Sequence, residues 1–505
     1  MRGAKRRGNL VLFCYKLRTA NYELVMNWIP LSIVCIYIVL LYVITWMTRR
    51  LSLGGMIAYL LAGRGLPFWV IAPLLTGLAV GGASTIGVAE WAYKAGISAG
   101  WYNAAWAAGA ILVGLIAARR YRRMEVSTIP ELFERHYSLT GRVIGVVGQL
   151  VLQIVITSVQ YVAGGAILSS LLPDMFSLKE GITVSAVVFV GIALIGGLWA
   201  AGLTNIINVI LIYVGILLGA VIAVTKIGGF GEFVAQLPSQ HPSFDLGAMG
   251  WGLVIAWFMV MCTMAFSVQS VVQISFAAKD SSSARKGFIL GGLIILPVGF
   301  ISAVIGLAAI ILHPNIDPKQ ALPLTVLSLS PLVAGLVLAG LWAADVSTAS
   351  ALLIGSATLV VGDLIKRFVA PDIKEKGERL ISQISILILS VFSYLLAITV
   401  SGTGILDSLL LGLSLTTAYT LVTLMTLFWP SVCRRGHATW TLLMSMAALA
   451  LWFVFPQVAS FFKKMSLVHP IYLCWITSLV TFFLVAVFDE RKIKIKGYAP
   501  QSNNL

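Results

Sequence analysis

The sequence predicts an all-α membrane protein with about thirteen transmembrane helices. Of its 505 residues, 59% are hydrophobic and only 11% are charged, and the mean hydropathy is +0.96, whereas soluble domains carry about 25% charged residues. Apolar runs of roughly 20 residues, the length that crosses about 30 Å of hydrocarbon, recur from Trp28 to Phe488. The longest connections, 119–142 and 226–248, are loop-sized, so we expect no soluble domain.

Charged or Pro/Gly-rich breaks separate the spans from one another. We place the spans near 28–47, 68–92, 102–118, 143–171, 181–200, 203–225, 249–276, 288–312, 331–363, 381–401, 404–429, 438–455 and 470–488. The chain is thereby divided into a basic N-terminal segment, residues 1–27, a transmembrane domain, residues 28–488, and a tail, residues 489–505.

The basic residues set the expected orientation of these spans. One set of alternate loops, together with the tail, holds 23 Lys and Arg residues, and the opposite loops between spans hold six. Because cytoplasmic loops carry the excess of Lys and Arg, the C-terminus is predicted to be cytoplasmic, and an odd number of spans places the N-terminus outside the cell membrane. The net charge of +16 therefore reflects contact with the membrane and indicates no nucleic-acid partner.

The N-terminal segment does not obey this rule. Residues 1–25 carry six basic residues on the side predicted to be external. No continuous apolar core with a small-residue cleavage site follows them, so a signal peptide is not expected. Two interpretations remain: the native chain starts at Met26, or the segment is a genuine exposed basic tail.

Two spans differ from the others in composition. The second contains "TGLAVGGASTIG" (Thr76–Gly87), and the seventh contains "MCTMAFSVQSVVQ" (Met261–Gln273). Broken or polar helices at matching positions in two halves are typical of inverted-repeat transporters. Since these spans are five apart, the repeats are predicted at about 68–225 and 249–429. Close helix packing through glycine is the alternative explanation.

The ninth span carries a polar cluster, within "GLWAADVSTASALLIGS" (Gly340–Ser356). Ala344, Ser347, Thr348 and Ala351 share one helix face. Hydroxyls, together with carbonyls freed by a broken helix, suit a dehydrated Na⁺. A packing seam whose hydroxyls bond to their own helix is the alternative. Asp345 lies at the edge of this face. A carboxylate at the bilayer centre costs about 2.5–3.5 kcal/mol.

Within this span, "AADVSTASALL" resembles the A-A-x-x-S-[ST]-x-x-S stretch of the sodium/solute symporter family, which includes proline, pantothenate, sialic acid and sugar cotransporters. Four further stretches resemble the family in the same order: "GGASTIGVAEWAYKAGISAGW", "STIPELFERHY", "GGLWAAGLTNIINVILIY" and "VQSVVQISFAAKDSSSARKG". The resemblance covers nearly the whole chain. It implies a LeuT-type core of two five-helix inverted repeats and sodium-coupled symport of a small polar organic solute into the cell by alternating access.

The resemblance also implies a sodium site where the second and ninth spans meet. Its ligands are the backbone carbonyls of Gly77, Val80 and Ala344 and the hydroxyls of Ser347 and Thr348. Two departures from the family pattern argue against a second sodium site. Asn205 stands where many members carry an acid, and Ala351 replaces a frequent hydroxyl.

Two acidic residues also depart from the family pattern. Asp345 occupies a position that is usually apolar, so it is a candidate coupling residue, and proton-coupled symport through Asp345 is an alternative to sodium coupling. Glu90 is four residues before Lys94, the favourable order for a helical ion pair. Its role is either structural or functional.

Polar residues of three spans are candidate solute contacts. By resemblance, the second, fourth and seventh spans line the solute cavity, which makes Ser84, Gln153 and Gln269 the predicted contacts. For any single amide, bonding between helices is the default interpretation. The sequence shows no obvious arginine clamp for a solute carboxylate.

Other classes of function fit less well. The five histidines are scattered in or beside loops, whereas a membrane-embedded enzyme needs clustered acid–base or metal-binding groups. No enzyme activity and no cofactor are therefore expected, and Na⁺ is the coupling ion. A transporter-like membrane sensor, signalling through a separate protein, remains a second alternative. The sequence does not indicate an oligomeric state.

Overall fold

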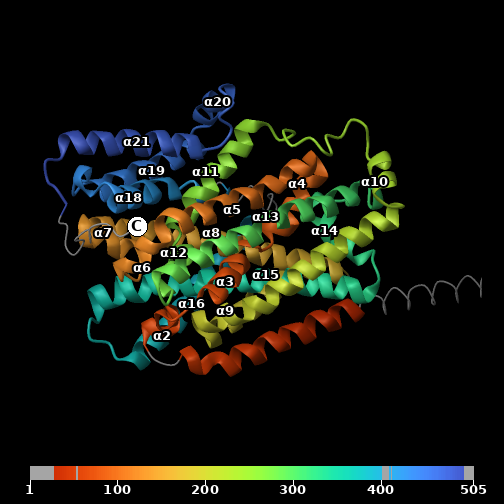
Figure 1. Ribbon diagram of the computed structural model, residues 1–505, viewed down its shortest axis with the longest axis horizontal. Coiled ribbons are helices and arrows are strands. Elements are labelled where there is room, and N and C mark those ends of the chain that lie inside the picture. The colour runs from red at the N-terminus through yellow and green to blue at the C-terminus, as the bar shows by residue number, and fades with distance from the viewer. Residues whose placement is uncertain (1–27, 53–54, 174, 401–408, 411, 494–505) are drawn as a thin grey trace, which may run out of the picture.

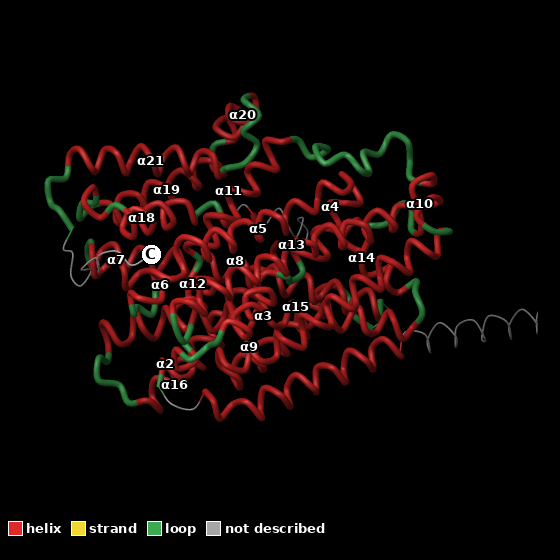
Figure 2. Tube along the Cα trace, in the orientation of Figure 1, coloured by secondary structure: helices red, strands yellow, loops and turns green. Residues whose placement is uncertain are grey.

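The computed structural model describes residues 28–52, 55–173, 175–400, 409–410 and 412–493. In these ranges the chain forms helices joined by short connections, and it contains no strand (Figure 2). The predicted all-α class is therefore confirmed for the described part of the chain. The expectation of a start at Met26 and most of the predicted tail lie outside the described residues.

The helices follow one another closely along the chain. The first half contains the helix Trp28–Ser52, α2 (Met56–Leu60), α3 (Phe68–Ala79), η3 (Ala83–Gly87), α4 (Val88–Ala95), α5 (Trp101–Leu112), η5 (Val113–Ala117), α6 (Ala118–Met124), α7 (Ile129–His136), α8 (Leu139–Leu171), α9 (Leu178–Ile227) and α10 (Phe230–Gln236). The second half contains α11 (Trp251–Ser267), α12 (Gln269–Ala277), α13 (Ser281–Leu312), α14 (Ala321–Leu327), α15 (Pro331–Thr358), η7 (Leu359–Val369), α16 (Glu375–Val400), α18 (Thr416–Phe428), α19 (His437–Val454), α20 (Pro456–Lys464) and α21 (Ile471–Phe488).

Many of these helices are long and apolar enough to cross a membrane. Among the described residues nine qualify singly, and the bent pair α11–α12 makes a tenth. The thirteen predicted spans exceed this number for two reasons. The helices α3 and α18 have only 12 and 13 residues, and α9 covers two predicted spans with a break in direction at Gly197.

The break in α9 requires glycine. Gly197 has a φ of +64°, a conformation that costs a residue with a side chain roughly 1 kcal/mol or more. A Cβ atom at this position would also lie 2.7 Å from the backbone oxygen of Tyr59. Both the backbone conformation and the close approach of α2 therefore favour glycine here.

The two spans singled out in the sequence are broken in the structure. The second ends its first helix, α3, at Ala79 and resumes as the π-helical turn η3 at Ala83. The seventh is bent by 46° between α11 and α12 at Val268, which has an extended backbone. Glycine packing alone does not account for these positions, because the helices are interrupted there.

The broken spans lie inside the bundle. In Figure 1, α18, α19 and α21 lie together along one long edge, and the helix Trp28–Ser52 lies along the opposite edge. Between them, α15 packs against α8, α9 and α3, and α13 packs against α3, α4 and α5. The short helix α7 lies at one end of the bundle, and α10 and α14 lie at the other (Figure 1).

Candidate sodium and solute site

The carbonyl of Gly77 is the centre of contact between the second and ninth spans. In an unbroken helix it would accept a hydrogen bond from the residue four positions later, but α3 ends at Ala79. Instead, the hydroxyls of Ser347 and Thr348 donate to it, at 3.0 and 2.8 Å. The break therefore exposes a carbonyl oxygen at the point where α15 presents two hydroxyls.

Four of the five predicted sodium ligands come together here. The same two hydroxyls also lie 2.8 and 3.0 Å from the carbonyl oxygen of Ala344, and both side chains are buried. Each hydroxyl thus lies within 3.0 Å of one carbonyl on each span. Val80, the fifth predicted ligand, lies in the break with a non-helical backbone, and its carbonyl makes no polar contact with the other four in the described part of the chain.

The glycines of the break allow side chains to approach its backbone. A Cβ at Gly81 would lie 2.9 Å from the hydroxyl of Thr348, and one at Gly82 would lie 2.9 Å from Oδ1 of Asp345. Both distances are shorter than Cβ contacts in proteins. The nearest atoms to these Cβ positions belong to Gln160 and Ala163 of α8, so larger residues would push both α8 and α15 away from the broken span.

A cavity lies where the two broken spans meet. Its lining includes Gly81 of the first break, Val268 of the second, and Thr348 of α15. Tyr102 and Trp106 of α5 also line it. Its volume is about 30 Å³, room for roughly one or two water molecules, so the structure has this region in a contracted form.

Two glutamines of α8 satisfy the backbone of both breaks. Gln160 accepts a hydrogen bond from the amide of Gly82 at 3.2 Å. Gln149 donates to the carbonyl of Ser267 at 2.7 Å and accepts from the amide of Gln269 at 3.0 Å. Bonding between helices is the default role that the sequence predicts for both amides, because an unpaired polar group at membrane depth is costly. Their partners, the backbone groups of the two breaks, are seen only in the structure.

Replacing Gln149 with leucine should destabilise the protein. The carbonyl of Ser267 and the amide of Gln269 would lose their partner, at about 1–3 kcal/mol each, which gives a loss of about 2–6 kcal/mol. The free energy of unfolding in detergent micelles measures it. Gln153→Leu is the matched control, because the side chain of Gln153 has no hydrogen-bond partner among the described residues. An equal loss in both variants would contradict the bridging role of Gln149.

The three predicted solute contacts have different environments. Ser84 donates its hydroxyl to the carbonyl of Ala79 across the break. Gln153 is buried with an unpaired amide beside Gly355, and Gly355 also lies close to Ser270, which lines the cavity. Gln269 instead bonds to the backbone of Ser127 and Ile129 beside α7, at 2.9 and 3.2 Å. The structure therefore places Gln269 in contact with a loop and outside the cavity lining.

The acidic residues Asp345 and Glu90 also differ. Glu90 is buried and pairs with Lys94 at 2.9 Å, the helical ion pair expected from their spacing. Asp345 is fully buried, and within the described ranges neither of its carboxylate oxygens has a hydrogen-bond partner.

Asn205 belongs to a chain of side-chain hydrogen bonds. Its amide oxygen accepts from Asn208 at 3.0 Å, and Asn208 in turn accepts from the hydroxyl of Tyr37. A Cβ at Gly77 would lie 2.5 Å from the side chain of Asn205. The amide of Asn205 thus packs directly against the backbone at Gly77, and Asn208 links it to Tyr37 of the helix Trp28–Ser52.

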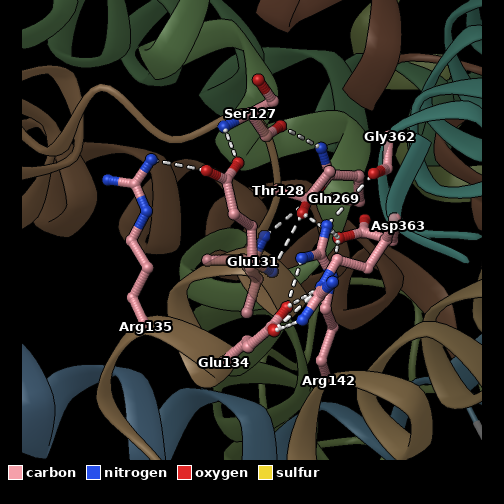
Figure 3. A network of polar contacts seen from close by, with 11 residues as sticks. Ser127, Thr128, Glu131, Glu134, Arg135, Arg142, Gln269, Gly362 and Asp363 are labelled. Atoms are coloured by element: carbon pink, nitrogen blue, oxygen red, sulfur yellow. Dashed lines mark hydrogen bonds and ion pairs between the residues drawn. The ribbon is translucent and has the colours of Figure 1, made fainter. Parts of the chain in front are cut away.

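A polar network joins α7 to three spans (Figure 3). Arg142 of α8 donates to Asp363 at 2.7 Å and to Glu134 of α7. Thr128, the N-cap of α7, also donates to Asp363, at 3.0 Å. Arg367 donates to Glu134 at 2.7 Å. The network therefore closes this end of the bundle by tying α7 to α8 and η7, with Gln269 adding α12.

The positive charges within this network favour the ionised form of Glu134. Partial burial of Glu134 acts to raise its pKa, but hydrogen bonds from Arg367 and Arg142 outweigh it, and the pKa is lower than that of an ordinary glutamate. Glu134 therefore stays anionic near neutral pH, and it holds both guanidinium groups.

Comparison with known proteins is consistent with this geometry. The model of the sodium:solute symporter family matches residues 59–445, which contain both breaks, α15 and the α7 network. The chain belongs to the sodium:solute symporter family. It is therefore a sodium-coupled solute symporter of the cell membrane, with Na⁺ and a small-molecule solute as its partners.

Curated relatives of the symporter are identical to it at about a quarter of the aligned residues. It is 26% identical over 396 residues to the sodium/glucose cotransporter of Vibrio parahaemolyticus, covering 70% of this chain and 72% of that protein. It is 24% identical over 462 residues to the osmoregulated proline transporter OpuE of Bacillus subtilis, covering 86% and 90%. The likeness to both extends over most of each chain.

Solved transporter structures share the fold of the symporter. A Na⁺-coupled sialic acid symporter in a substrate-bound outward-open state superposes with a TM-score of 0.78 at 14% identity, covering 93% of this chain and 99% of that one. Mhp1, a nucleobase-cation-symport-1 family transporter, gives 0.55 at 15% identity, covering 84% and 94%. These structures show the LeuT-type transporter fold that the resemblance implied.

Proposed function

We propose that this symporter carries a small polar organic solute into the cell together with one Na⁺, bound between the broken second span and α15. The observation that carries the proposal is the Gly77 carbonyl, freed by the break and contacted by the hydroxyls of Ser347 and Thr348. With the Ala344 carbonyl they supply four oxygens, and Val80 would supply the fifth once its carbonyl turns inward. The proposed stoichiometry is one, because the Asn205 amide already bonds to Asn208.

The position of the cavity supports alternating access. Both breaks line it, and Thr348 belongs both to its lining and to the sodium site. Ion and solute would therefore stabilise the same arrangement of the broken spans, so each should favour binding of the other. Because the cavity holds only about 30 Å³, solute entry requires the surrounding helices to separate.

We further propose thirteen spans with two inverted repeats of five. Dividing α9 at Gly197 and adding the short helices α3 and α18 to the ten candidates accounts for thirteen. The repeats would begin at about residues 68 and 249, so that each begins with a broken span. The two breaks and the two glutamines of α8 that satisfy them support this division.

The sodium:solute symporter family includes proteins named for chemically different solutes. The names of the relatives therefore limit the range of substrates only coarsely. The curated relatives are named for glucose and for proline. The amides and hydroxyls around the cavity fit a small polar organic molecule.

Uptake of a panel of radiolabelled sugars, amino acids and amines into proteoliposomes tests the function. Accumulation of at least one solute should require an inward sodium gradient, and accumulation independent of sodium would contradict it.

We propose that the end of the bundle carrying α7 faces the cytoplasm. The loops there hold most of the basic residues, which favours this orientation. In a cysteine-free background, Gln240→Cys on the opposite end should react with a membrane-impermeant thiol reagent in intact cells. Lys376→Cys, equally exposed, is the matched control and should react only after permeabilisation. The reverse pattern would invert the proposed topology.

A further inference from the structure

The helix Trp28–Ser52 is mostly exposed on its apolar surface but makes one buried polar contact. Ile36 and Val39 are exposed, whereas Tyr37 is buried and donates its hydroxyl to the side-chain amide oxygen of Asn208 on α9. Hydrocarbon offers no hydrogen-bond partner, so a buried hydroxyl in such a helix needs one within the protein. Many bonds of this kind only hold helices together. The function of this one therefore depends on what Asn208 contacts.

The hydrogen bond of Tyr37 continues through two asparagines to the broken second span. The amide nitrogen of Asn208 donates to the amide oxygen of Asn205 at 3.0 Å. The amide nitrogen of Asn205 in turn donates to the carbonyl of Leu74 in α3, at 3.5 Å. Both asparagines are buried. Each group thus donates in the same direction, from the phenol of Tyr37 to the backbone of α3, and each bond fixes the orientation of the next amide.

This chain of hydrogen bonds ends against the residue whose carbonyl we assign to sodium. A Cβ at Gly77 would lie 2.5 Å from both Cγ and Nδ2 of Asn205, so the amide packs directly against the backbone there. The hydroxyls of Ser347 and Thr348 contact the carbonyl of the same glycine. The Gly77 backbone is therefore held between α9 and α15, and a shift of Asn205 would allow its carbonyl to move.

A second tyrosine of the same helix, Tyr42, makes a similar bond that leads elsewhere. Its hydroxyl also donates to α9, to the carbonyl of Val188 at 2.8 Å. Val188 and Asn208 lie on opposite sides of the break at Gly197, and Val188 belongs neither to the proposed sodium site nor to the cavity lining found in the described residues. Both tyrosines therefore fix their helix to α9, but only Tyr37 connects it to the sodium site.

We propose that Tyr37 is a positioning residue of the sodium site, which through the two asparagines holds the Gly77 carbonyl where the hydroxyls of α15 meet it. This inference rests on the proposed sodium site and extends its support to a helix outside the two proposed repeats. Without the hydroxyl of Tyr37, Asn208 loses the bond that orients its amide, and the Gly77 carbonyl is no longer fixed before the ion binds. Sodium binding must then supply this ordering, so its affinity falls.

Tyr37→Phe and Tyr42→Phe form a matched pair, because each removes one hydroxyl and keeps the ring. Thermal unfolding of the purified full-length protein across a sodium titration gives the sodium midpoint of each variant. The net contribution of a neutral hydrogen bond corresponds to about a twofold to tenfold change in a binding constant. Tyr37→Phe should raise the sodium midpoint by that factor. Tyr42→Phe should leave the midpoint unchanged, even where it lowers the unfolding temperature in the absence of sodium.

A further variant tests whether the effect passes through α9. Asn208→Leu removes the link and keeps the side chain at a similar size, so it should also raise the sodium midpoint. The double variant Tyr37→Phe/Asn208→Leu should raise it no further than Asn208→Leu alone, because the two residues act in one chain of bonds.

An unchanged sodium midpoint in Tyr37→Phe, or an equal rise in Tyr42→Phe, would overturn the proposal. Independent effects that multiply in the double variant would also overturn it. If the midpoint rises in Ser347→Ala but not in Tyr37→Phe, the sodium site stands and only the positioning role fails. A wild-type protein that sodium does not stabilise would instead contradict the sodium site, and the positioning role with it.

Discussion

Ser347→Ala and Thr348→Ala should each raise the sodium concentration that gives half-maximal stabilisation by about tenfold to a hundredfold. Each removes one oxygen from a site with few ligands, and a polar contact to a charged group is worth about 1.5–3 kcal/mol. Thermal unfolding of the purified protein across a sodium titration measures the shift. High sodium should restore solute binding in both variants, because the two ligands are linked.

Matched controls for these variants lie on the same helix. The hydroxyls of Ser356 and Thr358 are buried and donate only to carbonyls of their own helix, Leu352 and Ile354. Their replacement with alanine should leave the sodium midpoint unchanged. If Ser347 and Thr348 only pack against the broken span, all four variants should behave alike. Equal sodium midpoints in all four would therefore remove Ser347 and Thr348 from the site.

Arg142→Met should destabilise the protein by about 3–5 kcal/mol, because it leaves the buried carboxylate of Asp363 without its cation. Adding Asp363→Asn should recover most of this loss, since the stranded charge is then removed. The free energy of unfolding in detergent micelles gives both values. The effect would be accompanied by loosening of α7, which Arg142 holds through Glu134.

The control for this prediction is Arg135→Met on α7 itself. In the pair of Arg135 with Glu131, about half of the arginine side chain is exposed to solvent, and ion pairs at the surface contribute about 0–1 kcal/mol. A loss in Arg142→Met no greater than in Arg135→Met would contradict the closing role of the network. So would a double variant as unstable as Arg142→Met alone.

The broken spans could be predicted from the sequence because their signals are local. Four glycines between Gly77 and Gly87 lower helix stability within a few turns, and the spacing of Ser347 and Thr348 places both hydroxyls on one face. The family pattern then connected these two segments. The contact of both hydroxyls with the Gly77 carbonyl, 270 residues away, follows from that connection and not from either segment alone.

Other features depend on partners that no local pattern indicates. The family resemblance predicts that Gln269 contacts the solute, and in the structure its amide donates to a loop residue 142 positions earlier, Ser127. Similarly, Arg142 and Asp363 are 221 residues apart. Two predicted spans follow each other without a loop in α9, where the non-helical backbone of Gly197 marks the kink between them. Such pairings are determined by tertiary packing, which periodicity does not encode.

Equilibrium binding of ²²Na⁺ to the purified protein tests the sodium site most directly. The wild type should bind one ion per chain, since Asn205 and Ala351 offer no second site. The double variant Ser347→Ala/Thr348→Ala should lose this binding at concentrations that saturate the wild type, while Ser356→Ala/Thr358→Ala should retain it. Full binding by the Ser347→Ala/Thr348→Ala variant would show that sodium binds elsewhere in the symporter.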